Sequence, residues 1–430
     1  MSKNHLSVIT AIALCGAILT ACGGNNGDTA ETTAQTGTTA VTTSPNIVTM
    51  APDVNAVDPN EPVDLAAGIT DKMYGRAILN EGNLTRLAAA MKKAENGEKV
   101  TVGVIGGSIT QGSSATNQNN CYASLFKKWW EEKFPSAEIS FVNAGIGGTN
   151  SYLGVHRVDE QLLAHNPDVV IVEFSVNDTD KTMNKYSYDS LVRKILSYET
   201  NPAVMLLFTT QENGTSLQDT HKEIGMAYDL PMISYREVVY QEVAAGTLDW
   251  KAISPDNIHP NDAGHGIIGQ LVDRYLNEVY DKLDTITEEP TAFTAEGYTN
   301  DYFKNAKMLG ADDITPTATE GFEVIESGFY HQFPNNWKTE AGGTMTFDVE
   351  CQNFGVFFLC TTDGKSGDYE VYVDGERKGK LEADFTGGWG TYGNTKQIIL
   401  SKETEKHTIE IKPAEGSEDK GITILGLMVS

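Results

Sequence analysis

The chain has 430 residues, 40% of them hydrophobic and 21% charged, which is the composition of a globular protein too long for one ordinary domain. Its 32 Lys and Arg against 59 Asp and Glu give a net charge of −27, which argues against nucleic acid and anionic membrane surfaces as partners. Five cysteines are too few for a disulfide scaffold, and 41 glycines with no fixed short period exclude collagen-like and solenoid arrays.

Residues 1–21 have the pattern of a lipoprotein signal peptide. Lys3 gives a basic start, and the apolar run from Leu6 to Leu19 is shorter than the roughly 20 residues of a bilayer span. The segment LTACG that follows resembles a bacterial lipobox, which implies that Cys22 is lipidated. The alternative is an ordinary signal peptide and an incidental cysteine. We expect an exported protein, anchored through Cys22 to the membrane at the bacterial cell surface or envelope.

Residues 22–61 are rich in Thr, Ala, Gly and Asn and have no apolar period. Such a segment cannot bury a core, so the sequence predicts a disordered tether. A flexible chain of about 40 residues reaches roughly 35 Å, far enough to hold a folded body away from a membrane.

Residues 62–284 alternate short β-type runs with longer helical patterns, which is typical of a three-layer α/β/α, doubly wound parallel sheet. The expected strands are Lys99–Ile105, Glu138–Asn143, Asp168–Phe174, Ala203–Thr209 and Met232–Ser234. The expected helices are Leu84–Ala94, Tyr122–Lys133, Gly154–Leu163, Tyr188–Tyr198, Asp219–Met226 and Ala263–Leu283. Ligands of such sheets bind outside the carboxyl ends of the strands, so the residues that follow each strand are the candidates for function.

Residues 285–318 read as a connector, and residues 319–430 as a jelly-roll-like β-sandwich. The expected strands of this region are Tyr369–Val373, Gln397–Leu400, His407–Ile411 and Ile422–Met428. Their alternating pattern and the Asp374-Gly375 turn signal favour strands, and no helical pattern is convincing. Cys351 and Cys360 fall in this region, where both a disulfide and two buried thiols remain open.

The first strand, VTVGVIG, runs into Gly107 and Ser108. A serine at the end of a strand is well placed for a nucleophile, although it can equally cap a helix or a turn. The segment is not the G-x-S-x-G elbow of α/β-hydrolases, because Thr110 stands where that motif has its last glycine.

Two further strand ends carry polar or flexible residues. The segment NAGIGG ends at Gly148, where the lack of a Cβ lets a backbone N–H approach a ligand. The segment SVND contains Asn177, whose amide can face the crevice or can form an Asx turn. We interpret Asp178 as a loop carboxylate that caps its neighbours.

Asp256 and His259 lie between the last strand and the final helix. A carboxylate three residues before a histidine can hold the imidazole through Nδ1–H, which leaves Nε2 to accept a proton from a hydroxyl group.

These four places, in this order, resemble the SGNH or GDSL hydrolase family from about Val100 to Leu283. The resemblance implies that Ser108 is the nucleophile, that Asp256 and His259 are the acid and base, and that Ser108, Gly148 and Asn177 form the oxyanion hole. The usual G-D-S reads Gly-Gly-Ser here, so the family's aspartate beside the nucleophile is absent. The G-G-S-I-T form is more similar to the carbohydrate-active members than to the lipases.

The implied chemistry is acyl transfer: Ser108 attacks an ester carbonyl, and water then clears the acyl-enzyme. We expect no metal and no organic cofactor, because the triad generates its own nucleophile. Four histidines lack the partner spacing of a metal site and are assigned to core or surface: His156, His165, His221 and His265.

Aromatic residues of the β region are candidates for sugar binding, because aromatic faces stack on sugar rings. Trp389 lies in the segment GGWG, which is typical of a loop, and Tyr392 follows it; Trp337 and Tyr330 are further candidates. The alternative for each is a core position, and for Tyr392, Trp337 and Tyr330 the core is favoured.

The sequence therefore predicts a surface lipoprotein and serine esterase that removes short acyl groups, O-acetyl above all, from a polysaccharide. One alternative is a lipase, lysophospholipase or thioesterase on the same scaffold; it would need a long apolar acyl channel, whereas the loop from Gln111 to Asn120 is polar. The other is a non-catalytic glycan-binding lipoprotein, which the intact Ser108, Asp256 and His259 argue against. The sequence gives no prediction of oligomeric state.

Overall fold

The computed structural model describes residues 55–326 and 328–430, and its residues from Pro52 onward group into one compact unit. The signal peptide predicted at residues 1–21, the lipidation site Cys22 and the tether up to residue 54 lie outside the described residues. Those assignments therefore stay predictions.

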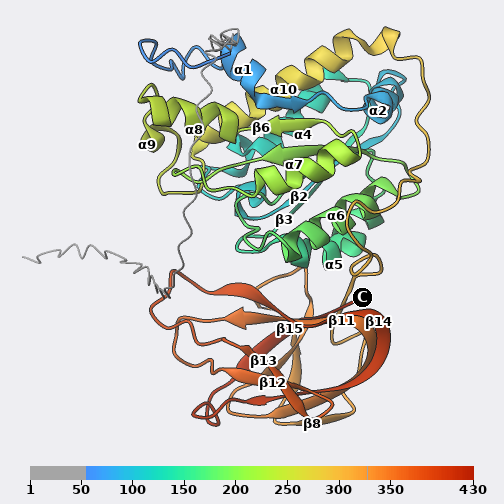
Figure 1. The fold of residues 1–430 in the computed structure, drawn as a ribbon, viewed down its shortest axis with the longest axis vertical. Helices are drawn as coiled ribbons and strands as arrows, with labels where there is room; N and C mark the ends of the chain where they lie inside the picture. Colours follow the sequence, from blue (N-terminus) through green and yellow to red (C-terminus); the bar gives the residue numbers. More distant parts are fainter. Residues whose placement is uncertain (1–54, 327) are drawn as a thin grey trace, which may run out of the picture. The chain divides into compact units, whose positions relative to one another are not determined.

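A six-stranded sheet forms the centre of the N-terminal region (Figure 1), with the strand order β1-β6-β5-β4-β2-β3. Its strands are β1 (Ile78–Asn80), β2 (Val100–Gly106), β3 (Ile139–Gly145), β4 (Val169–Glu173), β5 (Ala203–Phe208) and β6 (Met232–Ser234). The five strands from β2 to β6 run parallel, and β1 pairs with β6 in the antiparallel direction.

Helices cover both faces of this sheet. One buried cluster contains residues of α1 (Asp71–Ala77), α2 (Thr85–Glu95), α4 (Tyr122–Lys133), α8 (Arg236–Ala245), α9 (Trp250–Ile253) and α10 (Asp262–Asp281). The other contains residues of α5 (Ser151–Gln161), α6 (Met183–Leu196) and α7 (Gln218–Ala227). The remaining short helices are α3 (Ser108–Gln111), η1 (Gln118–Asn120), η2 (Leu163–His165) and η3 (Leu283–Thr285).

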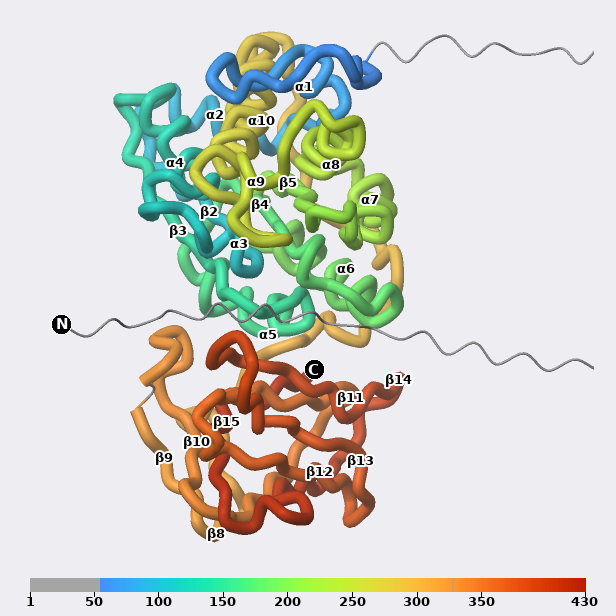
Figure 2. Tube along the Cα trace, turned by 90° about the vertical axis from the view of Figure 1, so that its left-hand side faces the viewer, coloured from blue at the N-terminus to red at the C-terminus, as the bar shows by residue number. Residues whose placement is uncertain are grey.

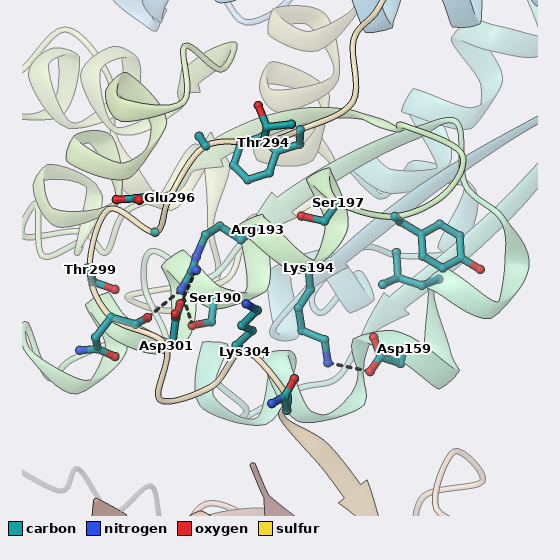
Figure 3. A pocket seen from close by; sticks show the side chains of 17 residues that line it. Asp159, Ser190, Arg193, Lys194, Ser197, Thr294, Glu296, Thr299, Asp301 and Lys304 are labelled. Atoms are coloured by element: carbon teal, nitrogen blue, oxygen red, sulfur yellow. Dashed lines mark hydrogen bonds and ion pairs between the residues drawn. The ribbon is translucent and has the colours of Figure 1, made fainter. Parts of the chain in front are cut away.

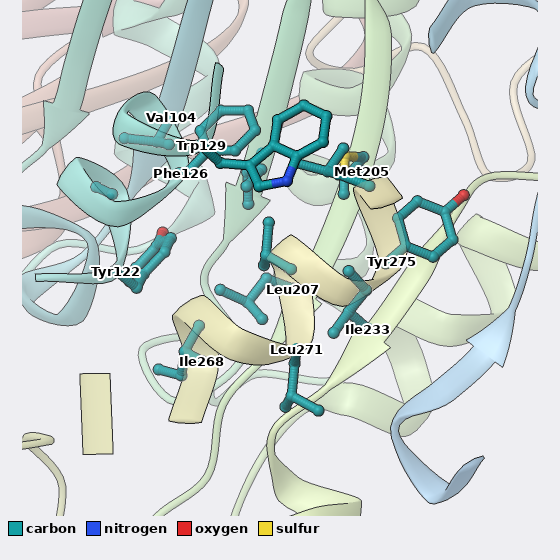
Figure 4. Close-up of a cluster of buried hydrophobic side chains, with 14 of the residues drawn as sticks. Val104, Tyr122, Phe126, Trp129, Met205, Leu207, Ile233, Ile268, Leu271 and Tyr275 are labelled. Atoms are coloured by element: carbon teal, nitrogen blue, oxygen red, sulfur yellow. The ribbon is translucent and has the colours of Figure 1, made fainter. Parts of the chain in front are cut away.

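Strand alternation sends successive side chains into the two cores. Met205 and Leu207 of β5 enter the first cluster, while Leu206 and Phe208 enter the second. Figure 4 shows the first cluster, in which side chains of β2, β5 and β6 meet α4 and α10. Because both faces are covered, the central strands are almost wholly apolar.

Sheet B, in the C-terminal region, has nine strands and only antiparallel ladders, in the order β13-β12-β14-β11-β15-β10-β9, with β8 on β11 and β7 on β15. The strands are β7 (Lys307–Leu309), β8 (Ala318–Glu320), β9 (Glu323–Glu326), β10 (Asn335–Thr339), β11 (Thr344–Cys360), β12 (Tyr369–Val373), β13 (Glu376–Leu381), β14 (Tyr392–Pro413) and β15 (Ile422–Val429). The predicted α/β fold followed by an all-β domain is confirmed. The segment expected to be a connector supplies β7.

A bulge in β11 lets this long strand bury side chains in the same core before and after it. Phe347 and Cys351 are buried before the register shift between Cys351 and Asn353, and Phe354 and Cys360 are buried after it, all in the same cluster. The extra residue therefore restores the inward alternation. Cys351 and Cys360 are both free thiols, which decides the question the sequence left open.

Helix α5 carries the contact between the two regions; in Figures 1 and 2 it is the helix next to sheet B. Tyr152 donates a hydrogen bond from Oη to Oδ1 of Asn353 at 3.1 Å, and Nδ2 of Asn353 lies 3.1 Å from Nε2 of His156. All three side chains are buried. Phe357 of β11 and Met428 of β15 belong to the same apolar cluster as the residues of α5.

Within the described ranges, 55–326 and 328–430, no helix combines the length and apolarity that a bilayer crossing requires.

Candidate active site

Ser108 is the first residue of α3 and lies two residues after Gly106, the end of β2. Two glycines let the chain turn there. A Cβ on Gly106 would lie 2.1 Å from Oγ1 of Thr110 and 2.4 Å from a backbone carbonyl oxygen, so no side chain fits at this position. A Cβ on Gly107 would lie 2.2 Å from Oδ1 of Asn177, so a side chain there would have to displace Asn177.

Ser108, His259 and Asp256 form one hydrogen-bonded chain. Oγ of Ser108 lies 2.9 Å from Nε2 of His259, and Nδ1 of His259 lies 2.8 Å from Oδ2 of Asp256. The structure thus brings together a hydroxyl and a histidine that are 151 positions apart in the sequence. In this arrangement Nδ1 carries the proton that Asp256 accepts, and Nε2 is left to accept the hydroxyl proton of Ser108.

The carboxylate of Asp256 is held by its own loop. Oδ1 accepts the backbone N–H groups of Ile258 and His259, each at 2.7 Å. Burial by itself would raise the pKa of Asp256, but the hydrogen bonds from His259 and Ile258 outweigh it and hold that pKa below its usual value. The carboxylate is therefore ionised at neutral pH and faces Nδ1 of His259.

Two residues that the sequence did not suggest support this loop. Trp250 donates its indole N–H to the carbonyl of Asp256 at 2.6 Å, and Oγ of Ser254 lies 2.6 Å from the carbonyl oxygen of His259. Both lie in or just after α9, a helix of four residues that is too short to show a periodic pattern.

Gly148 and Asn177 lie beside Ser108 on the neighbouring loops. Gly148 has φ +73°, a left-handed conformation that suits glycine, and its loop is tied to α3 because Gly147 donates its N–H to Oε1 of Gln111 at 2.8 Å. Among the described residues, nothing accepts the N–H of Ser108 or of Gly148, and the side-chain amide of Asn177 has no hydrogen-bond partner. Three donors thus stay available around Ser108.

Asp178 connects the Asn177 loop to the Gly148 loop. Its Oδ1 accepts the N–H of Ser151 at the start of α5, at 2.8 Å, and its Oδ2 lies 3.0 Å from Nε2 of His221. Its expected capping role agrees with these contacts. His221 is fully buried and stacks on Tyr188 with ring centroids 3.6 Å apart, a supporting role that the sequence did not indicate.

A cavity of about 840 Å³ opens over these residues and has walls from both regions of the chain. Sheet B and its loops contribute Phe329, Tyr330, Trp389 and Tyr392. Trp389 is 72% exposed and stacks on Tyr392, with centroids 4.7 Å apart and planes at 30°. Both rings reach the Gly148 loop, since a Cβ on Gly148 would lie 3.5 Å from Tyr392 and 3.7 Å from Trp389.

Trp337, in contrast, cannot face a ligand. It is only 2% exposed and packs edge to face on Phe347 inside sheet B, with centroids 5.3 Å apart. The prediction that Trp337 binds sugar is therefore wrong, and the core alternative holds because β10 points this side chain into the apolar cluster.

A second large cavity, of about 780 Å³, lies between α6 and residues 293–305 and contains none of these groups. As Figure 3 shows, two of its basic side chains point to carboxylates: Arg193 pairs with Asp301 at 2.7 Å and Lys194 with Asp159 at 2.6 Å. Of the described residues, no three His, Cys, Asp or Glu side chains gather as a metal site requires.

Comparison with known proteins places this geometry in a family. Residues 104–267 match the GDSL-like Lipase/Acylhydrolase family. A solved two-domain esterase, CEX, active on acetylated mannans, is 32% identical, with a TM-score of 0.78 over 83% of this chain and 98% of its own. The chain belongs to the GDSL-like lipase/acylhydrolase family.

This GDSL-like chain is a carboxylic ester hydrolase, as the family and its structural neighbours show. A crystal of CEX with mannopentaose gives 33% identity and a TM-score of 0.76 over 83% of this chain and 97% of that one. The likeness therefore extends over both regions, although the family match itself ends in α10. No curated protein sequence matches the chain.

Proposed function

We propose that this esterase removes short acyl groups, chiefly O-acetyl, from a polysaccharide, with Ser108 as nucleophile, His259 as base and Asp256 as acid. The hydrogen-bonded chain from Asp256 through His259 to Ser108 is the observation that carries the proposal. It ends at a cavity with an aromatic wall from sheet B, so a sugar can stack while its ester reaches Ser108.

In the first half-reaction His259 takes the proton of Ser108 through Nε2, and Oγ attacks the ester carbonyl. The negative charge that develops on the carbonyl oxygen is met by the N–H groups of Ser108 and Gly148 and by the amide of Asn177. His259 then gives its proton to the departing sugar hydroxyl. Water repeats the sequence on the acyl-enzyme, releases the carboxylic acid and restores Ser108.

Three observations support the proposed substrate class. The two CEX structures belong to an esterase active on acetylated mannans, and one of them was crystallised with mannopentaose. The exposed face of Trp389 offers a stacking surface at the rim of the cavity. The loop after Ser108 stays polar, and Oδ1 and Oδ2 of Asp262 bind Thr116, so it provides no apolar channel for a long acyl chain.

The test compares hydrolysis of p-nitrophenyl acetate, butyrate and octanoate, and acetate release from acetylated mannan and acetylated xylan, by the wild-type chain and by Ser108→Ala. We expect activity confined to short acyl groups, release from mannan, and loss of both in the variant. Preference for octanoate would favour a lipase. Absence of any Ser108-dependent hydrolysis would favour a glycan-binding lipoprotein without catalysis.

We further propose that Cys22 carries a lipid that anchors the exported protein. The support is the LTACG segment directly after an apolar run. In an expressing bacterium, the wild-type chain should partition into the detergent phase, and Cys22→Ser should shift it to the aqueous phase. Equal partitioning of both would contradict the proposal.

A further inference from the structure

Glu173 is a buried carboxylate that the reaction described above does not use. It is the last residue of β4, is 0% exposed, and pairs across the sheet with Gly106, two residues before Ser108. None of the ion pairs among the described residues includes it. An ionised group buried without a counter-charge costs stability unless hydrogen bonds satisfy it, so its position next to the site needs a physical explanation.

The hydrogen bonds of Glu173 join the two loops that carry the proposed nucleophile and one oxyanion donor. Thr110, in the turn of Ser108, donates from Oγ1 to Oε2 at 3.2 Å. Thr209, after β5, donates from Oγ1 to Oε1 at 2.6 Å. The backbone N–H of Ser175, two residues before Asn177, also donates to the carboxylate.

The directions of these bonds follow from Tyr122. Its hydroxyl is fully buried, and its one partner among the described residues is Oγ1 of Thr110, at 2.7 Å. Tyr122 must therefore donate to Thr110, and Thr110 in turn donates to Glu173. Oε2 is thus always an acceptor, and a proton on the carboxyl group must lie on Oε1.

Protonation would change the other side of the network. A proton on Oε1 of Glu173 must be donated to Oγ1 of Thr209, so the Thr209 hydroxyl can no longer donate to the carboxylate. Its hydrogen then turns to Oγ of Ser175, which lies 3.2 Å away and now accepts the N–H of Thr209 at 2.7 Å. The protonation state of Glu173 thereby changes the hydrogen bonds of Ser175, in the loop that contains Asn177.

We propose that Glu173 is a positioning residue that holds the Ser108 turn and the Asn177 loop in register when ionised, and that its protonation lowers the rate of ester hydrolysis. This inference rests on the roles proposed above for Ser108 and Asn177. Neither Glu173 nor its threonine partners touch the substrate; they act through the two loops.

The titration of Glu173 falls in an accessible range. Burial raises its pKa to about 7, against the hydrogen bonds from Thr209, Thr110 and Ser175, and Asp178 raises it further. The other titratable groups that face it are Tyr122 of α4 and Tyr188 of α6, whose pKa values burial raises well above 10, so both stay neutral. Below neutral pH, protonation of Glu173 should then lower the activity.

The experiment measures kcat and KM of Glu173→Gln on p-nitrophenyl acetate across pH. We expect kcat to fall about 10- to 100-fold with little change in KM, and the acidic limb of log kcat against pH to be less steep in the variant than in the wild type, by a slope of about one. Labelling of Ser108 by a fluorophosphonate should slow in parallel. The matched control is Asp189→Asn, a buried carboxylate of α6 bound to Thr299, which should keep the wild-type rate and slope.

Thr110 supplies a second test that keeps the carboxylate. Thr110→Ser retains the hydroxyl and should restore most of the rate that Thr110→Val loses. A folded Glu173→Gln with the wild-type rate and the wild-type slope would overturn the proposal, as would a Thr110→Val variant as active as Thr110→Ser. Activity that survives in Ser108→Ala would instead overturn the proposed function, and the two failures are therefore distinguishable.

Discussion

Asp256 uses both carboxylate oxygens at the site: Oδ1 accepts two backbone N–H groups of its own loop, and Oδ2 accepts Nδ1–H of His259. An amide in its place keeps the shape of the side chain but offers one oxygen only. If that oxygen stays on the backbone, an NH₂ group faces Nδ1 and selects the wrong tautomer of the imidazole. The residue thus fixes the tautomer as well as the position of His259.

From this we expect a graded loss of kcat. Ser108→Ala should lower kcat by about 10⁶, because it removes the nucleophile. Asp256→Asn should cost about 10⁴ through the tautomer. Asn177→Ala should cost about 10²–10³ as one oxyanion donor of three. Steady-state kinetics on p-nitrophenyl acetate measure all three values of kcat. A kcat for Asn177→Ala below that of Ser108→Ala would contradict the assignment.

Gly107 stands where the family usually has an aspartate, and in this chain the side chain of Asn177 occupies the space beside it. Any Cβ there would lie 2.2 Å from the side chain of Asn177. Gly107→Ala should displace Asn177 and lower kcat about 10²-fold with the fold intact, as for a lost oxyanion donor. The control is Gly266→Ala in α10, where a Cβ meets nothing within 4 Å. Circular dichroism checks folding, and equal kcat in both variants would refute the explanation.

Helix α10 packs along α4, and the burial of its residue Asp273 lowers the stability of the protein. Oδ1 of Asp273 is buried without a hydrogen-bond partner among the described residues. Burial, together with the nearby charge of Glu132, raises the pKa of Asp273 to about 7. Since this folded-state value lies above the unfolded one, stability is present at low pH and is lost as pH rises toward 7.

Asp273→Asn should therefore stabilise the protein increasingly between about pH 4 and pH 7, by about 1–2 kcal/mol at the upper end. The partial exposure of the group keeps this figure well below that of a fully buried charge. Urea unfolding of both forms at several pH values measures the difference. Equal stability at about pH 8 would show that the carboxylate is solvated.

Periodicity predicted the elements that are buried on both faces. β2, β4 and β5 appear within two residues of their expected bounds, because continuous apolar runs leave little choice. α1, β1 and α9 were missed, since each has seven residues or fewer and is stabilised by packing. The ten-residue helix α8 was missed as well, because it buries only Val238, Val239 and Glu242 and so has a weak apolar pattern. The separate strands expected at 397–400 and 407–411 are parts of the single strand β14, whose exposed middle hides its continuity.

The site was predictable for a related reason. Ser108, Gly148 and Asn177 follow strands of one parallel sheet, so their loops must gather at the same edge. Glu173 and His221 were not predictable, because only the tertiary structure shows which hydroxyls and carboxylates surround them. The contribution of sheet B to the cavity depends on the packing of two regions, which no local pattern records.

Asn353 stabilises the packing of the two regions through its hydrogen bonds. Its amide oxygen accepts hydrogen bonds from Tyr152 and from Gln397, and its NH₂ group faces His156. Burial lowers the pKa of His156 to about 3, so the imidazole stays neutral and Nε2 accepts, while Nδ1 lies 2.6 Å from the carbonyl of Tyr152. The contact is a satisfied polar network inside an apolar interface.

Asn353→Ala should therefore lower the free energy of unfolding by about 2–3 kcal/mol, since it leaves buried partners unpaired. Because it loosens the wall of the cavity, it should also reduce kcat/KM on acetylated mannan more than on p-nitrophenyl acetate. Calorimetry and the two assays measure these effects. Equal losses on both substrates would mean that the interface contributes to stability alone.

Trp389 lies in the part of the cavity wall that the C-terminal region contributes. Trp389→Ala should lower kcat/KM on acetylated mannan about 3- to 10-fold, the value of one aromatic contact, and leave p-nitrophenyl acetate nearly unchanged. Tyr298→Ala is the control, an exposed aromatic residue that does not line the cavity. Equal effects of both variants on the polymer would remove Trp389 from the binding surface.

Acetate release from acetylated mannan by the wild-type chain, Ser108→Ala and Trp389→Ala tests the proposed site most directly. We expect steady release by the wild type, none above background with Ser108→Ala, and slowed release with Trp389→Ala. Release that persists without the Ser108 hydroxyl would show that this serine does not attack an ester held between the two regions of the chain.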